Sequence, residues 1–274
     1  MKLFRTQQGI VIEQAGQHYA VSGAWDDLIA REDVQAYLQQ RIDSGQLQKT
    51  GAPKDILAPV VGQEVWAAGV TYLRSRDARK EESKSAGGGD FYDRVYAAER
   101  PELFFKSAGS RAVGTGGKVR IRKDSKWNVP EPELTLVMAA SGKIIGYTIG
   151  NDMSSRDIEG ENPLYLPQAK VYDGACALGP CILLSRDPLP ADTEIQIRIM
   201  REGKEMFSGA TAINRIKREL PSLAEYLYRE TTFPVGSLLM TGTGVVPPDT
   251  FTLRSGDEVI ITIPPIGTLS NAVA

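Results

Sequence analysis

The sequence predicts a mostly β protein of the α+β class, in which a small α/β N-terminal domain precedes a larger, antiparallel β-rich domain. Short strand patterns separated by turn residues dominate after Pro101, and helical patterns are scarce beyond that point. A chain of 274 residues is long enough for one large domain with a small appendage. We therefore expect domains at residues 1–58 and 59–274.

The lead domain begins with short strand patterns at Met1–Arg5, Ile10–Glu13 and His18–Ser22. Asp26–Gln48 then has helical spacing of its apolar residues. Glycine and proline between residues 51 and 59 mark the connector to the main domain.

In the main domain, Val60–Val70 leads into a charged, helix-like segment over Thr71–Ser85, which Gly87-Gly88-Gly89 follows. Three successive glycines make a flexible hinge, so residues 73–95 form either a mobile lid or a plain solvated loop. We expect a short helix at Ser222–Arg229, with Ser222 as its N-cap. The other patterns indicate strands, at Leu103–Lys106, Lys118–Arg122, Leu134–Met138, Lys143–Ile149, Ala177–Leu184, Glu194–Met200, Leu238–Thr241 and Glu258–Ile263.

Composition excludes several classes of function. A net charge of −2 gives no electrostatic footprint for nucleic acid, and no apolar run approaches the roughly 20 residues that span a membrane. The first residues lack a signal-peptide pattern, so we expect a cytoplasmic protein. The single histidine, His18, argues against histidine-based triads and metalloproteases. Proton transfer must then come from Glu, Asp, Lys or Tyr.

Glu131-Pro132-Glu133 and Asp152 are the most informative residues. If Ser141-Gly142 is a two-residue hairpin loop, Glu131 faces Asp152, and Glu133 shares the face of Glu131. Three clustered carboxylates repel one another unless a cation neutralises them, and all-oxygen ligation suits Mg²⁺, with Mn²⁺ or Ca²⁺ as alternatives. The other interpretation is three solvated acids on an exposed hairpin.

An ordered series of motifs resembles the fumarylacetoacetate hydrolase family over about residues 60–274. The motifs are Gly69-Val70-Thr71-Tyr72, Pro101–Lys106, Glu131–Leu134, Gly150–Asp157, Lys170–Asp173 with Gly179-Pro180, and Thr241–Gly244. The resemblance implies a mixed β-sandwich roll and a divalent ion on Glu131, Glu133 and Asp152. Further motifs, such as Glu161–Gln168, resemble the branch of the family that dehydrates 2-keto-3-deoxy sugar acids. In that branch, the residues that match Glu102 and Lys170 form the catalytic pair.

One departure from the family pattern bears on the reaction. Hydrolases of the family place a histidine after the motif that matches Gly69–Tyr72, whereas Thr71–Lys84 contains none. The departure argues against hydrolysis and fits a hydro-lyase that converts 2-keto-3-deoxy-D-arabinonate to 2,5-dioxopentanoate. The alternatives are another 2-keto acid reaction (acylpyruvate hydrolysis, decarboxylation or isomerisation) and a non-catalytic protein whose metal only stabilises the fold.

In a dehydration, Lys170 is the candidate for C3 proton transfer, and Glu102 for protonating the leaving hydroxyl. Each has an ordinary alternative as an exposed charge, and Lys170 has a second one, as a structural lysine that neutralises carboxylates. Schiff-base formation by Lys170 ranks lower because the metal makes it unnecessary.

Arg156 and Asp157 are expected to form a structural ion pair beside Asp152, and contact with the substrate ranks lower for them. Candidate contacts to the 2-keto acid substrate are Thr71, Tyr72, Lys106 and Thr243. Lys106 is also a candidate to neutralise Glu102 or the metal carboxylates, with a solvated lysine at the strand end as the alternative. As the family resemblance implies, we expect a homodimer or homotetramer.

Overall fold

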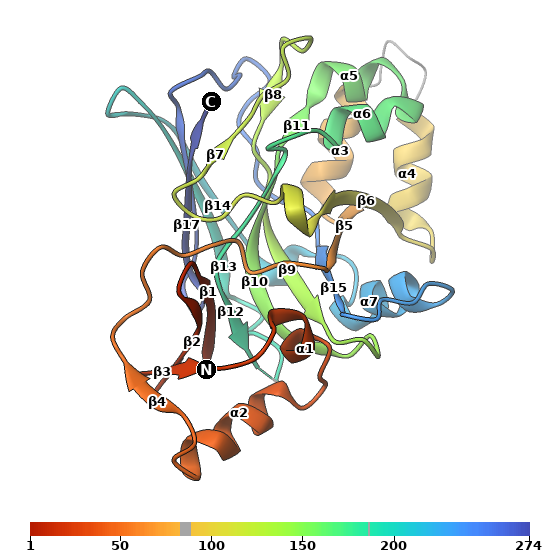
Figure 1. The fold of residues 1–274 in the computed structure, drawn as a ribbon. Coiled ribbons are helices and arrows are strands. Elements are labelled where there is room, and N and C mark those ends of the chain that lie inside the picture. Colours follow the sequence, from red (N-terminus) through yellow and green to blue (C-terminus); the bar gives the residue numbers. More distant parts are fainter. Residues whose placement is uncertain (83–88, 186) are drawn as a thin grey trace.

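The computed structural model describes residues 1–82, 89–185 and 187–274, and two large β-sheets form the framework of this part of the chain (Figure 1). The larger sheet is mixed, because β5 and β15 pair in parallel, whereas all other neighbouring strands of this sheet pair antiparallel. Its strands, in spatial order, are β4 (Gln48–Thr50), β3 (Gln17–Val21), β2 (Gly9–Gln14), β1 (Lys2–Thr6), β12 (Cys176–Leu184), β10 (Ile144–Asp152), β9 (Pro132–Met138), β15 (Ser237–Met240), β5 (Glu64–Gly69) and β6 (Glu102–Ala108).

The second sheet packs against the first and completes the predicted mostly β architecture. Its order is β14 (Lys204–Ala212), β13 (Glu194–Arg201), β16 (Glu258–Ile263), β17 (Gly267–Val273) and β7 (Lys118–Val119). A separate short pair joins β8 (Asn128–Val129) to β11 (Ser154–Ser155). The predicted fold class, mostly β with few helices, is thereby confirmed.

The described residues also form short helices. They are α1 (Trp25–Ile29), α2 (Val34–Asp43), α3 (Leu73–Glu82), α4 (Gly89–Ala97), α5 (Arg156–Glu161), α6 (Leu166–Lys170) and α7 (Leu220–Tyr228). Short 3-10 turns lie at η2 (Gly109–Arg111), η3 (Pro163–Tyr165) and η4 (Ile213–Arg215). In Figure 1, α3 to α6 gather beside the β5–β6 end of the large sheet.

Two helix predictions need correction. The predicted helix over Asp26–Gln48 is two helices, α1 and α2, with a break between them. Ser222 does not cap α7, because the helix already begins at Leu220, and Pro221 occupies its first turn, where a missing N–H costs nothing. Two residues of the proposed glycine hinge, Gly87 and Gly88, lie outside the described residues.

The central strands of the large sheet are covered on both faces. Every residue of β9 is buried. Leu134, Leu136 and Met138 pack toward the second sheet, in a cluster that includes Ile197 and Ile261. Val137 faces the other way, in a cluster built with the N-terminal residues. Because both faces are buried, a charged residue near this strand must have partners within the protein.

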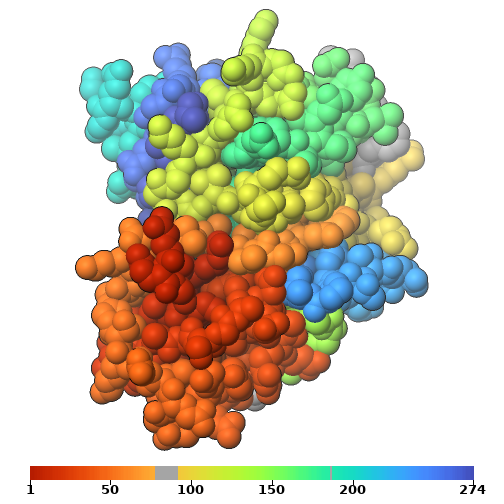
Figure 2. Space-filling model, viewed as in Figure 1, coloured from red at the N-terminus to blue at the C-terminus, as the bar shows by residue number. Residues whose placement is uncertain are grey.

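The N-terminal strands extend the large sheet, since β1 pairs with β12. Figure 2 shows residues near the N-terminus gathered over the lower part of one face of the molecule. Whether the chain divides at residue 58 stays a prediction. In the described residues, no helix combines the length and apolar character needed to cross a bilayer.

Candidate active site

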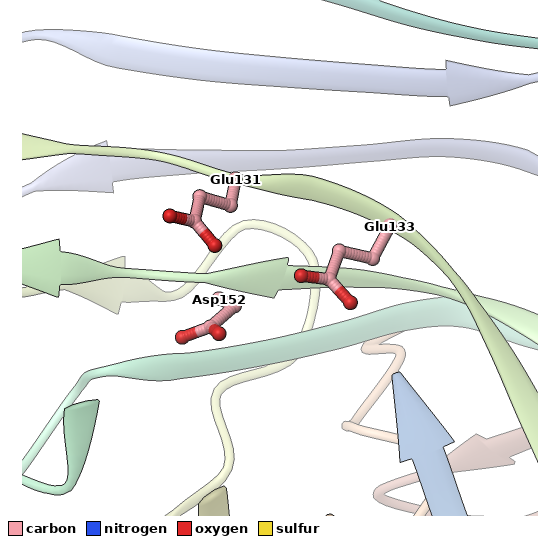
Figure 3. A group of neighbouring side chains, drawn as sticks. All are labelled: Glu131, Glu133 and Asp152. Atoms are coloured by element: carbon pink, nitrogen blue, oxygen red, sulfur yellow. The ribbon is translucent and has the colours of Figure 1, made fainter. Parts of the chain in front are cut away.

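The three predicted acids lie together inside the protein (Figure 3). Glu131 is 5% exposed, and Glu133 and Asp152 are each 1% exposed, so the alternative of solvated surface acids is wrong. One carboxylate oxygen from each lies within 4.8 Å of the others. They line a small pocket, together with residues that include Gly69, Phe104, Arg156, Lys170, Gly242 and Thr243.

Pairing of β9 with β10 creates this cluster. Val137 faces Gly146 and Pro132 faces Asn151, which is the predicted register. Beyond the last ladder pair, the N–H of Asp152 donates to the carbonyl of Glu131 over 3.0 Å. Glu133 lies two residues further along β9, and side chains two apart in a strand share a face.

Three residues, not two, form the hairpin loop. The N–H of Ala139 donates to the carbonyl of Lys143 over 2.9 Å, which leaves Ala140–Gly142 as the loop. Met138 therefore faces Ile144, one residue out of the predicted register. A β-bulge between Ile144 and Gly146 restores that register before the acids are reached.

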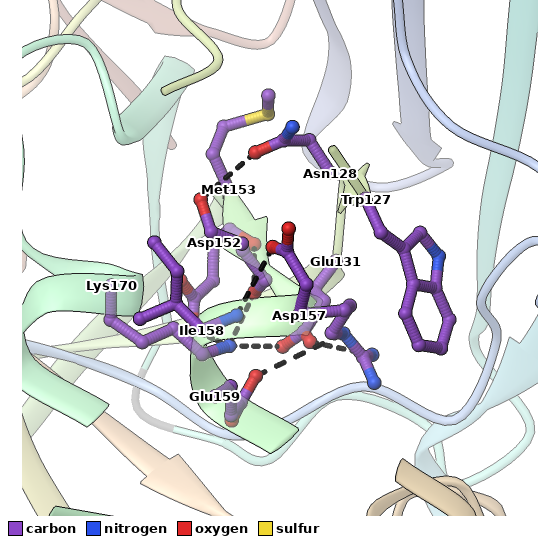
Figure 4. A network of polar contacts seen from close by, with 12 residues as sticks. Trp127, Asn128, Glu131, Asp152, Met153, Asp157, Ile158, Glu159 and Lys170 are labelled. Carbon is purple, nitrogen blue, oxygen red and sulfur yellow. Dashed lines mark hydrogen bonds and ion pairs between the residues drawn. The ribbon is translucent and has the colours of Figure 1, made fainter. Parts of the chain in front are cut away.

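Lys170, at the end of α6, holds the centre of the cluster (Figure 4). Its side chain is fully buried, and Nζ lies 2.8 Å from Oε2 of Glu131 and 3.0 Å from Oδ2 of Asp152. It also donates to Oγ of Ser154 over 2.5 Å. The alternative of a solvated surface lysine is therefore wrong.

Lys106 is a second buried lysine, on β6. Its Nζ lies 2.5 Å from Oδ1 of Asp152 and donates to the carbonyl oxygens of Met153 and Lys170 over 3.0 and 2.5 Å. Lys106 thus holds the Asp152 carboxylate in place and also connects the end of α6 to the large sheet. Its ammonium group already contacts three protein oxygens.

Arg156 pairs with Glu131, not with Asp157 as predicted. Its Nη2 lies 2.7 Å from Oε1 of Glu131, and its Nε lies 4.0 Å from Oε2 of Glu159. Asp157 instead accepts hydrogen bonds from the Ser125 hydroxyl and the Lys126 N–H. Adjacent residues at the start of α5 point in different directions, and sequence adjacency alone did not reveal that.

The surroundings of Glu133 disfavour its charged form. Burial raises its pKa well above the ordinary value, and the nearby charges of Asp152 and Glu131 raise it further. The N–H of Gly242 donates to Oε2 of Glu133 over 2.5 Å and stabilises the charged form. Without a bound cation, the site therefore resists carrying three ionised carboxylates.

Glu102 begins β6 at the edge of the same pocket. It faces Gly69, the last residue of β5, in the sheet register. A Cβ atom at position 69 would lie only 2.0 Å from Oε2 of Glu102, so the carboxyl group rests directly on the glycine backbone. Gly69 lines the pocket, so Glu102 contacts a residue of the pocket wall.

The other predicted contact residues differ in how they reach the pocket. Thr243 lines it, and its hydroxyl donates to the carbonyl of Val245 over 3.0 Å. The hydroxyl of Thr71 donates to the carbonyl of Thr241 over 2.6 Å, so this side chain joins two pocket segments. Tyr72 is 1% exposed, and burial raises the pKa of its phenol.

Sequence reasoning missed Ser154, and it placed Arg156 with the wrong partner. Both side chains are buried and touch the cluster, Ser154 through Lys170 and Arg156 through Glu131. Their position in the sequence could have indicated this, because the Ser154–Arg156 run begins two residues after Asp152 and contains both the hydroxyl and the guanidinium.

The donors and the charges fit a hard divalent cation. All the candidate ligand atoms are carboxylate oxygens, which Mg²⁺ prefers over nitrogen or sulfur donors. The buried carboxyl groups of the cluster (Glu131, Glu133, Asp152 and Glu159) outnumber its buried cations (Lys106, Lys170 and Arg156) by one. With all four ionised, a divalent cation and one substrate carboxylate would bring the cluster to neutrality.

Comparison with known proteins supports this interpretation of the site. A family model described as the C-terminal region of fumarylacetoacetate hydrolase matches residues 65–274. The chain belongs to the fumarylacetoacetate hydrolase family. Within this family, the chain is 50% identical over 216 residues to a probable 2-keto-3-deoxyxylonate dehydratase of Haloferax volcanii, covering 78% of this chain and 73% of that protein.

A second relative acts on a closely related sugar acid. The chain is 44% identical over 220 residues to the 2-dehydro-3-deoxy-D-arabinonate dehydratase of Saccharolobus solfataricus, covering 80% of this chain and 74% of that protein. A solved 2-keto-3-deoxy-D-arabinonate dehydratase, complexed with magnesium and 2,5-dioxopentanoate, superposes with a TM-score of 0.83 at 33% identity, covering 100% of this chain and 98% of that chain.

Proposed function

We propose that this protein is a magnesium-dependent hydro-lyase that dehydrates a 2-keto-3-deoxy pentonate, 2-keto-3-deoxy-D-arabinonate to 2,5-dioxopentanoate. The observation that carries the proposal is the buried triad of Glu131, Glu133 and Asp152 with Lys170 beside it. Two dehydratases of such acids are 44–50% identical to the chain, and one related structure holds magnesium with 2,5-dioxopentanoate.

Glu131, Glu133 and Asp152 would hold the ion. When bound, a divalent ion polarises the 2-keto group and acidifies the protons on C3. The substrate carboxylate supplies the negative charge that balances the cluster. The buried position of all three acids excludes water from this end of the substrate and strengthens each electrostatic contact.

Lys170 is the proposed base for the C3 proton. Its Nζ lies beside the carboxylates of Glu131 and Asp152. The side chain is buried, and Nζ lies 5.8 Å from the centre of the Phe104 ring. The hydroxyl of Ser154 at 2.5 Å fixes the direction of the amine. A buried, oriented amine beside the carbon acid is what proton abstraction requires.

Glu102 is the proposed acid for the second half of the reaction. It donates a proton to the hydroxyl on C4, which leaves as water, and C3 and C4 become joined by a double bond. The unsaturated product then tautomerises in two steps. A proton leaves C5 and one adds at C3, which gives an enol, and the enol then loses its hydroxyl proton and gains one at C4 to give the aldehyde. The position of Glu102 against Gly69 supports this role.

Contacts from Thr71, Tyr72, Lys106 and Thr243 to the substrate stay proposals. Thr243 has the most direct support, because it lines the pocket. Lys106 supports the site through Asp152, so its effect on the substrate is expected to be indirect. A homodimer or homotetramer is also proposed, and the mass of the protein in solution tests it. The cytoplasmic location stays a prediction.

The deciding experiment is a magnesium-dependent assay with 2-keto-3-deoxy-D-arabinonate that follows aldehyde formation. We expect turnover that EDTA abolishes and that Lys170→Ala lowers by about a hundredfold or more. Lys143→Ala is the matched control, because the Lys143 side chain is 56% exposed and lies 4.0 Å from Glu32 on the surface. Magnesium binding without turnover would sink the dehydratase assignment and direct the search to other 2-keto acids.

A further inference from the structure

The chain makes a long excursion between two residues that face each other at the pocket. It leaves the large sheet after Gly69 and returns at Glu102, and these two residues are partners in the β5–β6 ladder. Helices α3 and α4 lie within the excursion. Both ends of the excursion therefore meet where the Glu102 carboxyl rests on Gly69.

A single segment, Ile216–Arg218, contacts both ends. On the outgoing side, the N–H of Lys217 donates to the carbonyl of Thr71 over 3.0 Å, and Ile216 forms a β-bridge with Tyr72. On the returning side, the Lys217 ammonium donates to the carbonyl of Tyr96 and lies 4.3 Å from the centre of that ring. The segment thus joins the two ends across the base of the excursion.

Arg218 makes most of the contacts on the returning side. Its Nη1 donates to the carbonyl of Glu99 over 2.8 Å. Its Nη2 lies within hydrogen-bonding distance of three more carbonyls, those of Val95 at 2.9 Å, Ala98 at 3.0 Å and Arg100 at 3.4 Å. These carbonyls belong to the end of α4 and to the turn that leads through Pro101 into Glu102.

This arrangement suits the chemistry of both partners. The last carbonyls of a helix have no partners within it, and they carry the negative end of the helix dipole. The planar guanidinium presents several donors in a fixed fork, so one arginine can hold several carbonyls in one geometry. A lysine offers a single ammonium centre and cannot span them in the same way.

We propose that Arg218 is a positioning residue for Glu102: by gathering the carbonyls of residues 95–100, it fixes the turn that sets the Glu102 carboxyl against Gly69. The inference rests on the proposed function in one respect, which is the role of Glu102 as the acid. Arg218 itself does not line the pocket and contacts neither the carboxylate triad nor Lys170 in the described contacts.

The test combines hydrogen exchange with kinetics on full-length Arg218→Met and Arg218→Lys variants. We expect faster amide exchange in the peptide covering residues 95–104 for Arg218→Met. We also expect kcat to fall about 10- to 100-fold, since a displacement of about 1 Å at a reacting group has that effect. KM and the magnesium dissociation constant should stay within about twofold, and Arg218→Lys should recover part of kcat.

Arg31→Met is the control. Arg31 pairs with Asp33 over 3.0 Å and lies 4.2 Å from the centre of the Tyr37 ring, and in the described contacts it touches no residue of the 95–100 turn. Its loss should change neither exchange in residues 95–104 nor kcat. An equal fall of kcat in both variants would overturn the proposal, because a general loss of stability would then explain the result.

A double-mutant cycle with Glu102→Gln tests whether the effect of Arg218 on kcat depends on Glu102. If Arg218 acts through Glu102, Arg218→Met adds no further loss of kcat in the Glu102→Gln background. Additive losses, or unchanged exchange in residues 95–104, would overturn the proposal. Failure of the proposed function shows differently, as a wild-type protein without dehydratase turnover, and hydrogen exchange still decides whether Arg218 holds the turn.

Discussion

Glu133 is both a candidate metal ligand and part of the hydrogen-bonded framework of the pocket. Its pKa is raised well above the ordinary value, because it is buried and lies near two other carboxylates. Its carboxylate accepts a hydrogen bond from the N–H of Gly242, at the start of the Gly242–Gly244 segment. The same side chain thus links the candidate metal site to one wall of the pocket.

We expect Glu133→Gln to abolish magnesium binding and turnover together. The amide keeps the size of the side chain but removes one of the three negative charges, and loss of a direct ligand should weaken binding by at least about a hundredfold. The variant should fold, because the neutral amide relieves repulsion. Calorimetric titration with magnesium and the dehydratase assay measure both effects.

Glu194→Gln, at the exposed start of β13, is the control for this variant. It should bind magnesium and turn over like the wild type. Stoichiometric magnesium together with full activity in Glu133→Gln would show that the ion binds elsewhere.

At this scale, the sequence predicted which acids gather but not how their charges are balanced. Glu131, Glu133 and Asp152 follow from strand periodicity and one hairpin. Lys106 and Arg156 reach the cluster from β6 and α5, whose positions depend on long-range packing. The prediction that Lys106 neutralises one of the metal carboxylates is confirmed, but no local pattern could show that its partner is Asp152, 46 residues further along the chain.

At the scale of elements, the β9–β10 hairpin shows how a register can be right while its loop is wrong. The turn residues Ser141-Gly142 were identified, but the loop holds three residues. The bulge near Ile145 compensates for the extra residue. A bulge is decided by the twist and packing of the whole sheet, and the sequence of one hairpin does not contain that information.

The β5–β6 pair carries the prediction that belongs to this scale. Gly69→Ala would place a Cβ 2.0 Å from Oε2 of Glu102, closer than any real contact, so the carboxyl group must move. We expect kcat to fall about 10- to 100-fold while the protein stays folded and binds magnesium. Steady-state kinetics and circular dichroism measure these outcomes.

Gly51→Ala is the matched control for that substitution. A Cβ at Gly51 would meet nothing within 4 Å, and its φ lies outside the range that disfavours side chains. Its activity should match that of the wild type. If Gly69→Ala also kept full activity, Glu102 could not depend on its contact with Gly69, and its role as the acid would lose its main structural support.

At the scale of the whole molecule, the packing that forms the core also buries the three carboxylates, and burial makes their charged forms unfavourable. The central sheet is covered by apolar residues on both faces, and the N-terminal strands lengthen that sheet through the β1–β12 pairing. The sequence predicted the N-terminal strands but not this pairing, because it joins residues about 180 positions apart. The acids therefore lie deeper than a solvent-facing hairpin would place them.

This burial predicts that magnesium stabilises the protein more as pH rises. The folded-state pKa of Glu133 lies above its unfolded value, so the metal-free protein has its full stability below the unfolded pKa. That stability is lost as pH rises toward the folded pKa, by about 1.4 kcal/mol for each pH unit between the two values. The magnesium-bound protein should escape this loss, because the cation neutralises the ionised carboxylate.

Denaturant unfolding with and without saturating magnesium, from mildly acidic to mildly alkaline pH, measures this difference. We expect the gap in unfolding free energy to widen with pH for the wild type. In Glu133→Gln the metal-free protein should lose this part of its pH dependence, since an amide does not titrate. A gap that is constant with pH in the wild type would mean that Glu133 is ionised without the metal. The buried cations around the triad, and not magnesium, would then be sufficient to hold its charge.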